Sequence, residues 1–248
     1  MKKSRPLLGF FSIWLLKGIC FGFELNVFQV GQANFTICVV GQQALVFDCG
    51  SAKPGEWVDS KKKFKRAKET VIGNLLNGVT EVTIVISHNH IDHLNLAEAL
   101  QKFCEKHRET HQVFKGWEIV KKETGEEQSM FSNILGEDVN VIPLLPSSRE
   151  RLSPTEPHDN NLVLKIALRA GGPAILLTGD GSKNLLHSIN PDLLCDIGVL
   201  ILSHHGSNAS DELVWFRTVK INNENRPVLY LISSDPKGKD HIPAYETI

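Results

Sequence analysis

The segment that most constrains this chain is His88-Asn89-His90-Ile91-Asp92-His93, which directly follows the apolar run Val82–Ser87. The run has the length and the Val and Ile content of a buried strand, so the segment should lie where a strand leaves a sheet and a helix begins. Packing four imidazole and carboxylate groups into six residues without a cation is costly on desolvation grounds. These groups are the ligands expected for zinc, with iron and manganese as alternatives. The segment therefore predicts a metal site at the end of this strand.

Further candidate ligands lie beside other predicted strands. They are His158, before the run Leu162–Leu168; Asp180, after Leu176-Leu177-Thr178-Gly179; and His204 and His205, after Ile201-Leu202-Ser203. Taken singly, each is equally well explained as an ordinary turn or loop residue. Taken together they would complete a site in which the Asp180 carboxylate bridges two cations and a hydroxide nucleophile forms at neutral pH.

Short strands alternate with amphipathic helices along the chain. Strands are predicted at Glu24–Val30, Asn34–Val40, Ala44–Cys49, Val82–Ser87, Val139–Leu145, Leu162–Leu168, Ala174–Thr178, Val199–Ser203 and Val228–Ser233. Helices are predicted around Val71–Leu76, Leu96–Cys104, Ser182–Ile189 and Asp211–Val219. The first three strands should form an antiparallel meander. Two strand-rich halves without a linker between them predict one α+β domain over residues 23–248, with a sheet-on-sheet core covered by helices.

Composition limits the classes of partner. Hydrophobic residues make up 42% of the 248 and charged residues 22%, which excludes collagen-like, coiled-coil and disordered chains. The net charge of −1 excludes a general electrostatic grip on nucleic acid or an anionic membrane, so any polyanion contact must be local. The dense basic run Lys61–Lys68 could supply it, although such a run is also typical of a solvated helix start.

The first 22 residues have the pattern of a secretory signal peptide. Lys2, Lys3 and Arg5 precede the apolar run Leu7–Leu16, and small residues at Cys20 and Gly22 suit cleavage after Gly22. The run is shorter than the roughly 20 residues that a membrane-spanning helix needs. We therefore expect an exported protein, periplasmic or secreted, with no membrane span in the mature chain; an uncleaved N-terminus would instead anchor it to the membrane.

The order of the candidate ligands resembles the metal-binding pattern of the metallo-β-lactamase superfamily, whose fold is an αββα sandwich of two mixed β-sheets flanked by helices. Other segments are similar to the metallo-hydrolase domain of the competence protein ComEC and its free-standing relatives. These segments are Val27–Gln32, Asp159–Leu164, Leu176–Asp180, His204–Ser210, and Leu231–Ser233 through His241–Pro243. The resemblance covers Glu24 to Ile248.

The resemblance implies two zinc ions per chain and a role for each candidate residue. His88, His90 and His158 would hold the first ion, Asp92, His93 and His204 the second, and Asp180 would bridge them. His204 is preferred to His205 as a ligand because it comes first off the strand. Asp92 and His205 are the expected catalytic residues, and His205, Ser207 and His241 would contact a leaving group or a phosphate oxygen. Alternatively, His205 contacts no substrate and instead orients the metal ligands by hydrogen bonding to them.

The same resemblance ranks the expected activities. Hydrolysis of a phosphodiester, in a small molecule or a nucleic acid, comes first, by a metal-activated water. Hydrolysis of another ester, a lactone or a thioester comes second, and a catalytically weak nucleic-acid-binding module of the DNA-uptake type comes third. The sequence departs from the ComEC-type pattern where Gln29 replaces a usual Asp and where the metal loop has histidines in place of aspartates. The second departure makes it more like the hydrolytically active branches.

Overall fold

The computed structural model describes residues 11–13, 22–28, 33–51, 73–107, 110–121, 131, 133–148, 150, 152–202, 210–223 and 228–231. Its elements, in chain order, are β1 (Phe11–Ile13), β2 (Phe23–Val27), β3 (Phe35–Val40), β4 (Gln43–Cys49), α2 (Gly73–Leu75), β5 (Glu81–Ile86), α3 (Ile91–Leu94), α4 (Ala97–His107), β6 (Thr110–Lys115), α5 (Gly116–Lys121), β7 (Val139–Leu144), β8 (Val163–Leu168), β9 (Ala174–Leu177), α7 (Lys183–Ser188), η2 (Pro191–Leu194), β10 (Ile197–Ile201), α8 (Ser210–Asn222) and β11 (Leu229–Leu231).

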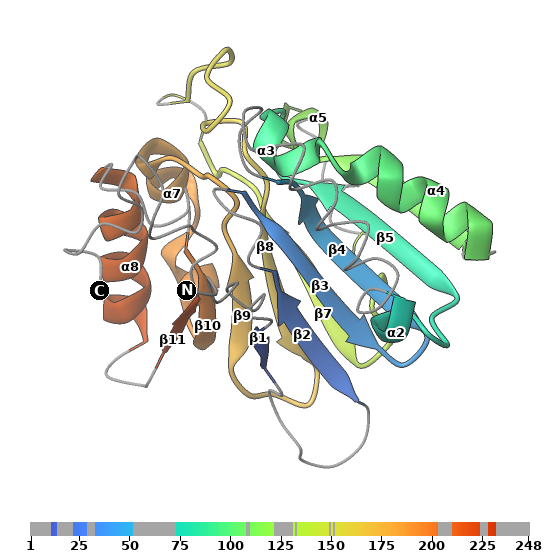
Figure 1. Ribbon diagram of the computed structural model, residues 1–248. Coiled ribbons are helices and arrows are strands. Elements are labelled where there is room, and N and C mark those ends of the chain that lie inside the picture. Colours follow the sequence, from blue (N-terminus) through green and yellow to red (C-terminus); the bar gives the residue numbers. More distant parts are fainter. Residues whose placement is uncertain are drawn as a thin grey trace, which may run out of the picture.

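The strands form two mixed sheets. The first has the order β1-β2-β3-β4-β5-β6, antiparallel up to β4 and parallel from β4 to β6. The second has the order β11-β10-β9-β8-β7, parallel from β11 to β9 and antiparallel from β9 to β7. Figure 1 shows α3 and α4 beside the first sheet and α7 and α8 beside the second. This arrangement confirms the predicted αββα sandwich, including its opening antiparallel meander.

Alternation along the strands explains the layers. On β4, Leu45 and Phe47 point between the sheets and pack with Leu164 and Ile175 of the second sheet. Residues of the opposite parity face outwards: those of the first sheet pack against α4, and those of the second against α7, η2 and α8. Because both faces of the central strands are buried, these strands read as continuous apolar runs. That property made them recognisable in the sequence.

The hairpin of β3 and β4 is irregular at its far end. A two-residue turn at Gly41-Gln42 places Cys38 opposite Leu45. A regular continuation would place Cys49 opposite Asn34, but the register shifts beside Phe35, and Cys49 pairs with Phe35 instead. The shift coincides with Asp48, whose φ of 56° lies in the left-handed region. A left-handed residue costs about 1–2 kcal/mol, and the site described below shows what holds Asp48 in this conformation.

The edges of the first sheet were not predicted from the sequence. β6 carries mostly exposed residues, so it lacks the apolar pattern of the inner strands. β1 lies inside the predicted leader and pairs antiparallel with β2. Cleavage after Gly22 would remove β1 and leave β2 as the edge strand. Among the described residues no helix is long and apolar enough to cross a membrane.

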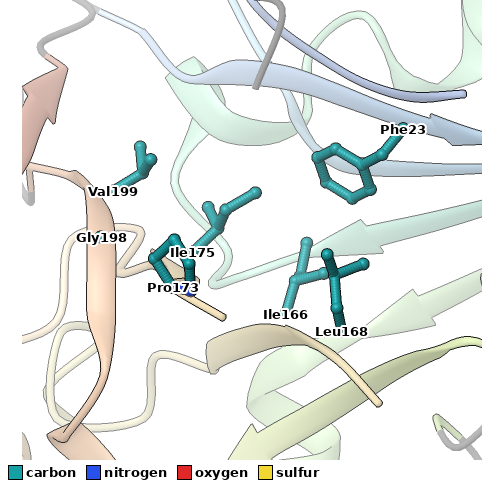
Figure 2. Close-up of a pocket in the computed structure, with 7 residues that line it drawn as sticks. All are labelled: Phe23, Ile166, Leu168, Pro173, Ile175, Gly198 and Val199. Carbon is teal, nitrogen blue, oxygen red and sulfur yellow. The ribbon is translucent and has the colours of Figure 1, made fainter. Parts of the chain in front are cut away.

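The two ends of the sandwich differ in chemistry. One end holds an apolar pocket, lined by Phe23 from the first sheet and by residues of the second that include Ile166, Pro173 and Val199 (Figure 2). Phe23 pairs with the last residue of β3, and Pro173 directly precedes β9. His88 and Asp180 are at the opposite end, after the last residues of β5 and β9. The fold therefore separates an apolar end from a polar end.

Candidate metal centre

The polar end begins where β5 leaves the first sheet. Ser87 and His88 continue the buried strand, His90 keeps an extended backbone, and α3 then begins at Ile91. This short helix carries Asp92 and His93, and its first turn brings the ring centroid of His93 to 4.2 Å from that of His88. The strand-to-helix change predicted from the sequence is therefore confirmed.

Gly50 allows α3 to reach this position. A Cβ atom on Gly50 would lie 1.5 Å from the carbonyl oxygen of Asp92 and 2.8 Å from the nitrogen of His93. The backbone of α3 therefore packs directly on the end of β4, where Leu96 also donates a hydrogen bond to the Cys49 carbonyl at 2.9 Å. Only glycine fits a contact this close.

The structure brings six of the seven predicted ligands into two groups that share one carboxylate. One group is His88, His90, His158 and Asp180, and the other is Asp92, His93 and Asp180. In each group one potential ligand atom per residue lies within 4.8 Å of all the others, an arrangement that could hold a metal ion. His204 and His205, together with Ser207, His241 and the basic run Lys61–Lys68, lie outside the described residues.

Three of the four residues of the first group are histidines, which come from segments beside both sheets. The ring centroids of His88 and His90 are 4.5 Å apart, and those of His90 and His158 are 4.9 Å apart. Nε2 of His158 lies 3.3 Å from Nδ1 of His90, so these two nitrogens are within hydrogen-bonding distance of each other. His158 precedes β8, whereas the other two follow β5. The cluster thus joins segments that are far apart in the sequence.

His88 provides a test of whether a cation suits this group. Its side chain is fully buried, and Nδ1 lies 3.1 Å from the Ser87 hydroxyl. Its Nε2 is buried with no hydrogen-bond partner among the described residues. Burial, reinforced by the neighbouring His93, lowers the pKa of His88 well below its ordinary value. A neutral imidazole with an unpaired, buried nitrogen is the form that binds a transition metal, so the residues fit such an ion.

The second group places His93 between two carboxylates. Its Nδ1 is 2.8 Å from Oδ2 of Asp48, and its Nε2 is 3.3 Å from Oδ2 of Asp180. Burial by itself would lower the pKa of His93, but the charges of Asp180 and Asp48 and hydrogen bonds to them raise it well above its ordinary value. The position therefore attracts positive charge, which a proton or a metal ion can supply.

Asp48 is a site residue that the sequence analysis missed. Its carboxylate accepts hydrogen bonds from the Ser87 backbone N–H at 2.7 Å and from the Ser87 hydroxyl at 3.0 Å, in addition to its contact with His93. These bonds hold the left-handed backbone of Asp48 in place and orient the imidazole of His93. The available signal was an aspartate at the end of an apolar strand, two residues before Gly50.

We predict that Asp48→Asn weakens metal binding. An asparagine offers one acceptor oxygen and turns an NH2 group towards a donor that now bonds to the carboxylate. His93 then loses its fixed orientation. Zinc affinity should fall about 10- to 100-fold, as is usual when a residue that hydrogen-bonds to a metal ligand is changed. Competition with a chromophoric chelator measures the change. Wild-type affinity in this variant would show that Asp48 does not orient His93.

Several solved structures are similar to this chain at low sequence identity. The metallo-β-lactamase fold protein YhfI from Bacillus subtilis is 12% identical, with a TM-score of 0.43 over 84% of this chain and 96% of that chain. Unliganded yeast PDE1 is 8% identical, with a TM-score of 0.42 over 88% of each chain. A motif mutant of a metallo-β-lactamase from Cronobacter sakazakii is 14% identical, with a TM-score of 0.31 over 66% of this chain and 69% of that chain. No family model and no curated protein sequence matches the chain.

Proposed function

We propose that the protein is a metal-dependent hydrolase that holds two ions, most simply zinc, at the polar end of the sandwich. The observation that carries the proposal is the convergence of six imidazole and carboxylate side chains into two groups that share Asp180. His88, His90 and His158 would hold one ion, and Asp92, His93 and the undescribed His204 the other. When bound, such ions supply Lewis acidity, which favours ionisation of water and offsets negative charge in the transition state.

The protein's own residues prepare this site before any ion binds. Asp48 orients His93, and the Ser87 hydroxyl lies between Asp48 and Nδ1 of His88. Asp180 is almost fully buried, whereas Asp92 and His90 are half-buried at the rim. The rim is therefore the side from which a substrate can approach, and Asp92 is the described carboxylate best placed to contact it.

We further propose that the substrate is a phosphodiester and that the protein acts outside the cytoplasm. The sequence resemblance to ComEC-type metallo-hydrolase domains supports the phosphodiester, and the absence of cysteine from the described donor groups argues only against a β-lactamase. The signal-like N-terminus supports export, and mass spectrometry of the native protein can test it. An intact Met1 on cytoplasmic protein would contradict export.

A panel of substrates tests the reaction class. Zinc-loaded protein should hydrolyse a small phosphodiester such as bis(p-nitrophenyl) phosphate, and His204→Ala should abolish that turnover. Changing Lys61, Lys62 and Lys63 to Gln should raise KM for a nucleic acid at low salt, because fewer counterions are released on binding, but leave the small diester unaffected. A metal-loaded protein that cleaves lactones or thioesters and no phosphodiester would contradict the phosphodiester proposal and leave the metal-dependent hydrolase in place.

A further inference from the structure

The turn that carries Asp180 is tightly packed against neighbouring segments. It spans Thr178 to Asp180, between β9 and α7, and its middle residue, Gly179, has a φ of +55°. A Cβ atom on Gly179 would lie 2.4 Å from Oδ1 of Asn161 and 2.7 Å from Cβ of Ser87. The position of the shared carboxylate is thus set by two residues outside both donor groups.

Asn161 is hydrogen-bonded to the first and the last residue of this turn. It lies just before β8 and is fully buried. Its Oδ1 accepts a hydrogen bond from the backbone N–H of Asp180 at 2.9 Å, and its Nδ2 donates to the carbonyl oxygens of Thr178 at 2.7 Å and Leu162 at 3.0 Å. One amide side chain therefore holds both ends of the turn and fixes them to the start of β8.

The adjacent backbone connects this turn to the other sheet. The N–H of Leu162 donates to the carbonyl oxygen of Ser87 at 2.9 Å. Ser87 directly precedes His88, so the chain of contacts runs from Asp180 through Asn161 and Leu162 to the start of the metal loop. The donor segments of the two sheets are held together by this connection.

We propose that Asn161 is a positioning residue for metal binding, which places the Asp180 carboxylate between the two donor groups before an ion arrives. The proposal rests on the proposed function, because it assigns a task to a residue that contacts no ion itself. Since Asp180 belongs to both groups, a change at Asn161 should weaken binding at both together. Preorganised ligands bind more tightly because ordering them costs nothing at the moment of binding.

The test is zinc binding by Asn161→Asp. The variant keeps the size of the side chain and the oxygen that accepts from Asp180, but it replaces Nδ2 with an oxygen that faces two carbonyl oxygens. We expect zinc affinity, measured by competition with a chromophoric chelator, to fall about 10- to 100-fold for both ions. The visible absorption spectrum of the Co²⁺-substituted protein should also change, because it reports the geometry of the ligands rather than overall stability.

Asn223 offers a matched control at the other end of the second sheet. It is also buried, accepts from the backbone N–H of Ile197 at 2.8 Å, and donates to the carbonyl oxygens of Val219 at 2.7 Å and Leu194 at 3.2 Å. Asn223→Asp therefore makes the same chemical change in the same hydrogen-bonding pattern, away from Asp180. It should lower the melting temperature as Asn161→Asp does, but leave zinc affinity and the Co²⁺ spectrum unchanged.

The outcomes separate this proposal from the proposed function. Wild-type zinc affinity in folded Asn161→Asp would overturn the positioning role, and so would an equal loss in Asn223→Asp. If Asn161→Asp does not fold, Asn161→Ser removes the bond to Asp180 without adding a charge, and it should show the same loss; wild-type affinity there would equally overturn the proposal. Wild-type protein that binds no zinc would instead overturn the proposed function itself.

Discussion

Asp180→Asn should release metal from both donor groups at once and reduce turnover by about 10²- to 10³-fold, the range observed when one group that stabilises transition-state charge is lost. Asp180 is the residue that the two groups share, and its Oδ2 lies 3.3 Å from Nε2 of His93. An amide at this position keeps the shape of the side chain but removes the charge. Elemental analysis and steady-state kinetics on the same preparation measure both effects.

Asp196→Asn is the control for the loss of one negative charge. Asp196 directly precedes β10, at the opposite end of the second sheet, and has a φ of 61°, a conformation that asparagine tolerates. This variant should retain metal and activity. Full metal content in Asp180→Asn, or an equal loss in both variants, would contradict the role assigned to Asp180.

His88→Leu should change the free energy of unfolding in opposite directions with and without metal. In a chelator, the variant should be more stable by about 1 kcal/mol, because leucine removes a buried Nε2 that has no hydrogen-bond partner among the described residues. The Ser87 hydroxyl, which also loses its contact with Nδ1, keeps its bond to Asp48. At a zinc concentration about 1,000 times the dissociation constant, metal binding should raise the free energy of unfolding of the wild type by about 4 kcal/mol. The variant should show little of this stabilisation. Urea denaturation under the two conditions measures the difference.

His187→Leu provides the comparison for this pair of measurements. His187 is exposed on α7, so the same substitution there changes neither a buried nitrogen nor a donor group. It should follow the wild type in chelator and in zinc. If His88→Leu also gained the full stabilisation by zinc, His88 would not belong to the metal centre.

Five of the six candidate donors that the structure brings together could be located from the sequence because they follow strongly apolar strands. The buried runs that became β5 and β9 locate the segments that follow them, and a sheet brings the ends of its parallel strands to one edge. His158 shows the limit of this reasoning. It precedes β8 rather than following a strand, and only the antiparallel pairing of β8 with β9 places it beside His90.

The supporting residues could not be predicted in the same way, because their roles depend on tertiary contacts. Asp48 acts through a left-handed backbone and a shift of register, neither of which has a periodic pattern. Asn161 acts through bonds to backbone atoms of a turn that follows 17 residues later. The edge strand β6 escaped prediction for a related reason, since its pairing with β5 depends on backbone bonds and not on an apolar face.

Counting the metal bound to the purified protein tests the central claim most directly. The chain should be loaded with zinc, freed of excess by gel filtration, and analysed by inductively coupled plasma mass spectrometry together with its protein concentration. Two donor groups that share Asp180 predict close to two ions per chain, with Asp180→Asn binding none tightly. A folded wild-type protein that retains no transition metal after this treatment would contradict the claim.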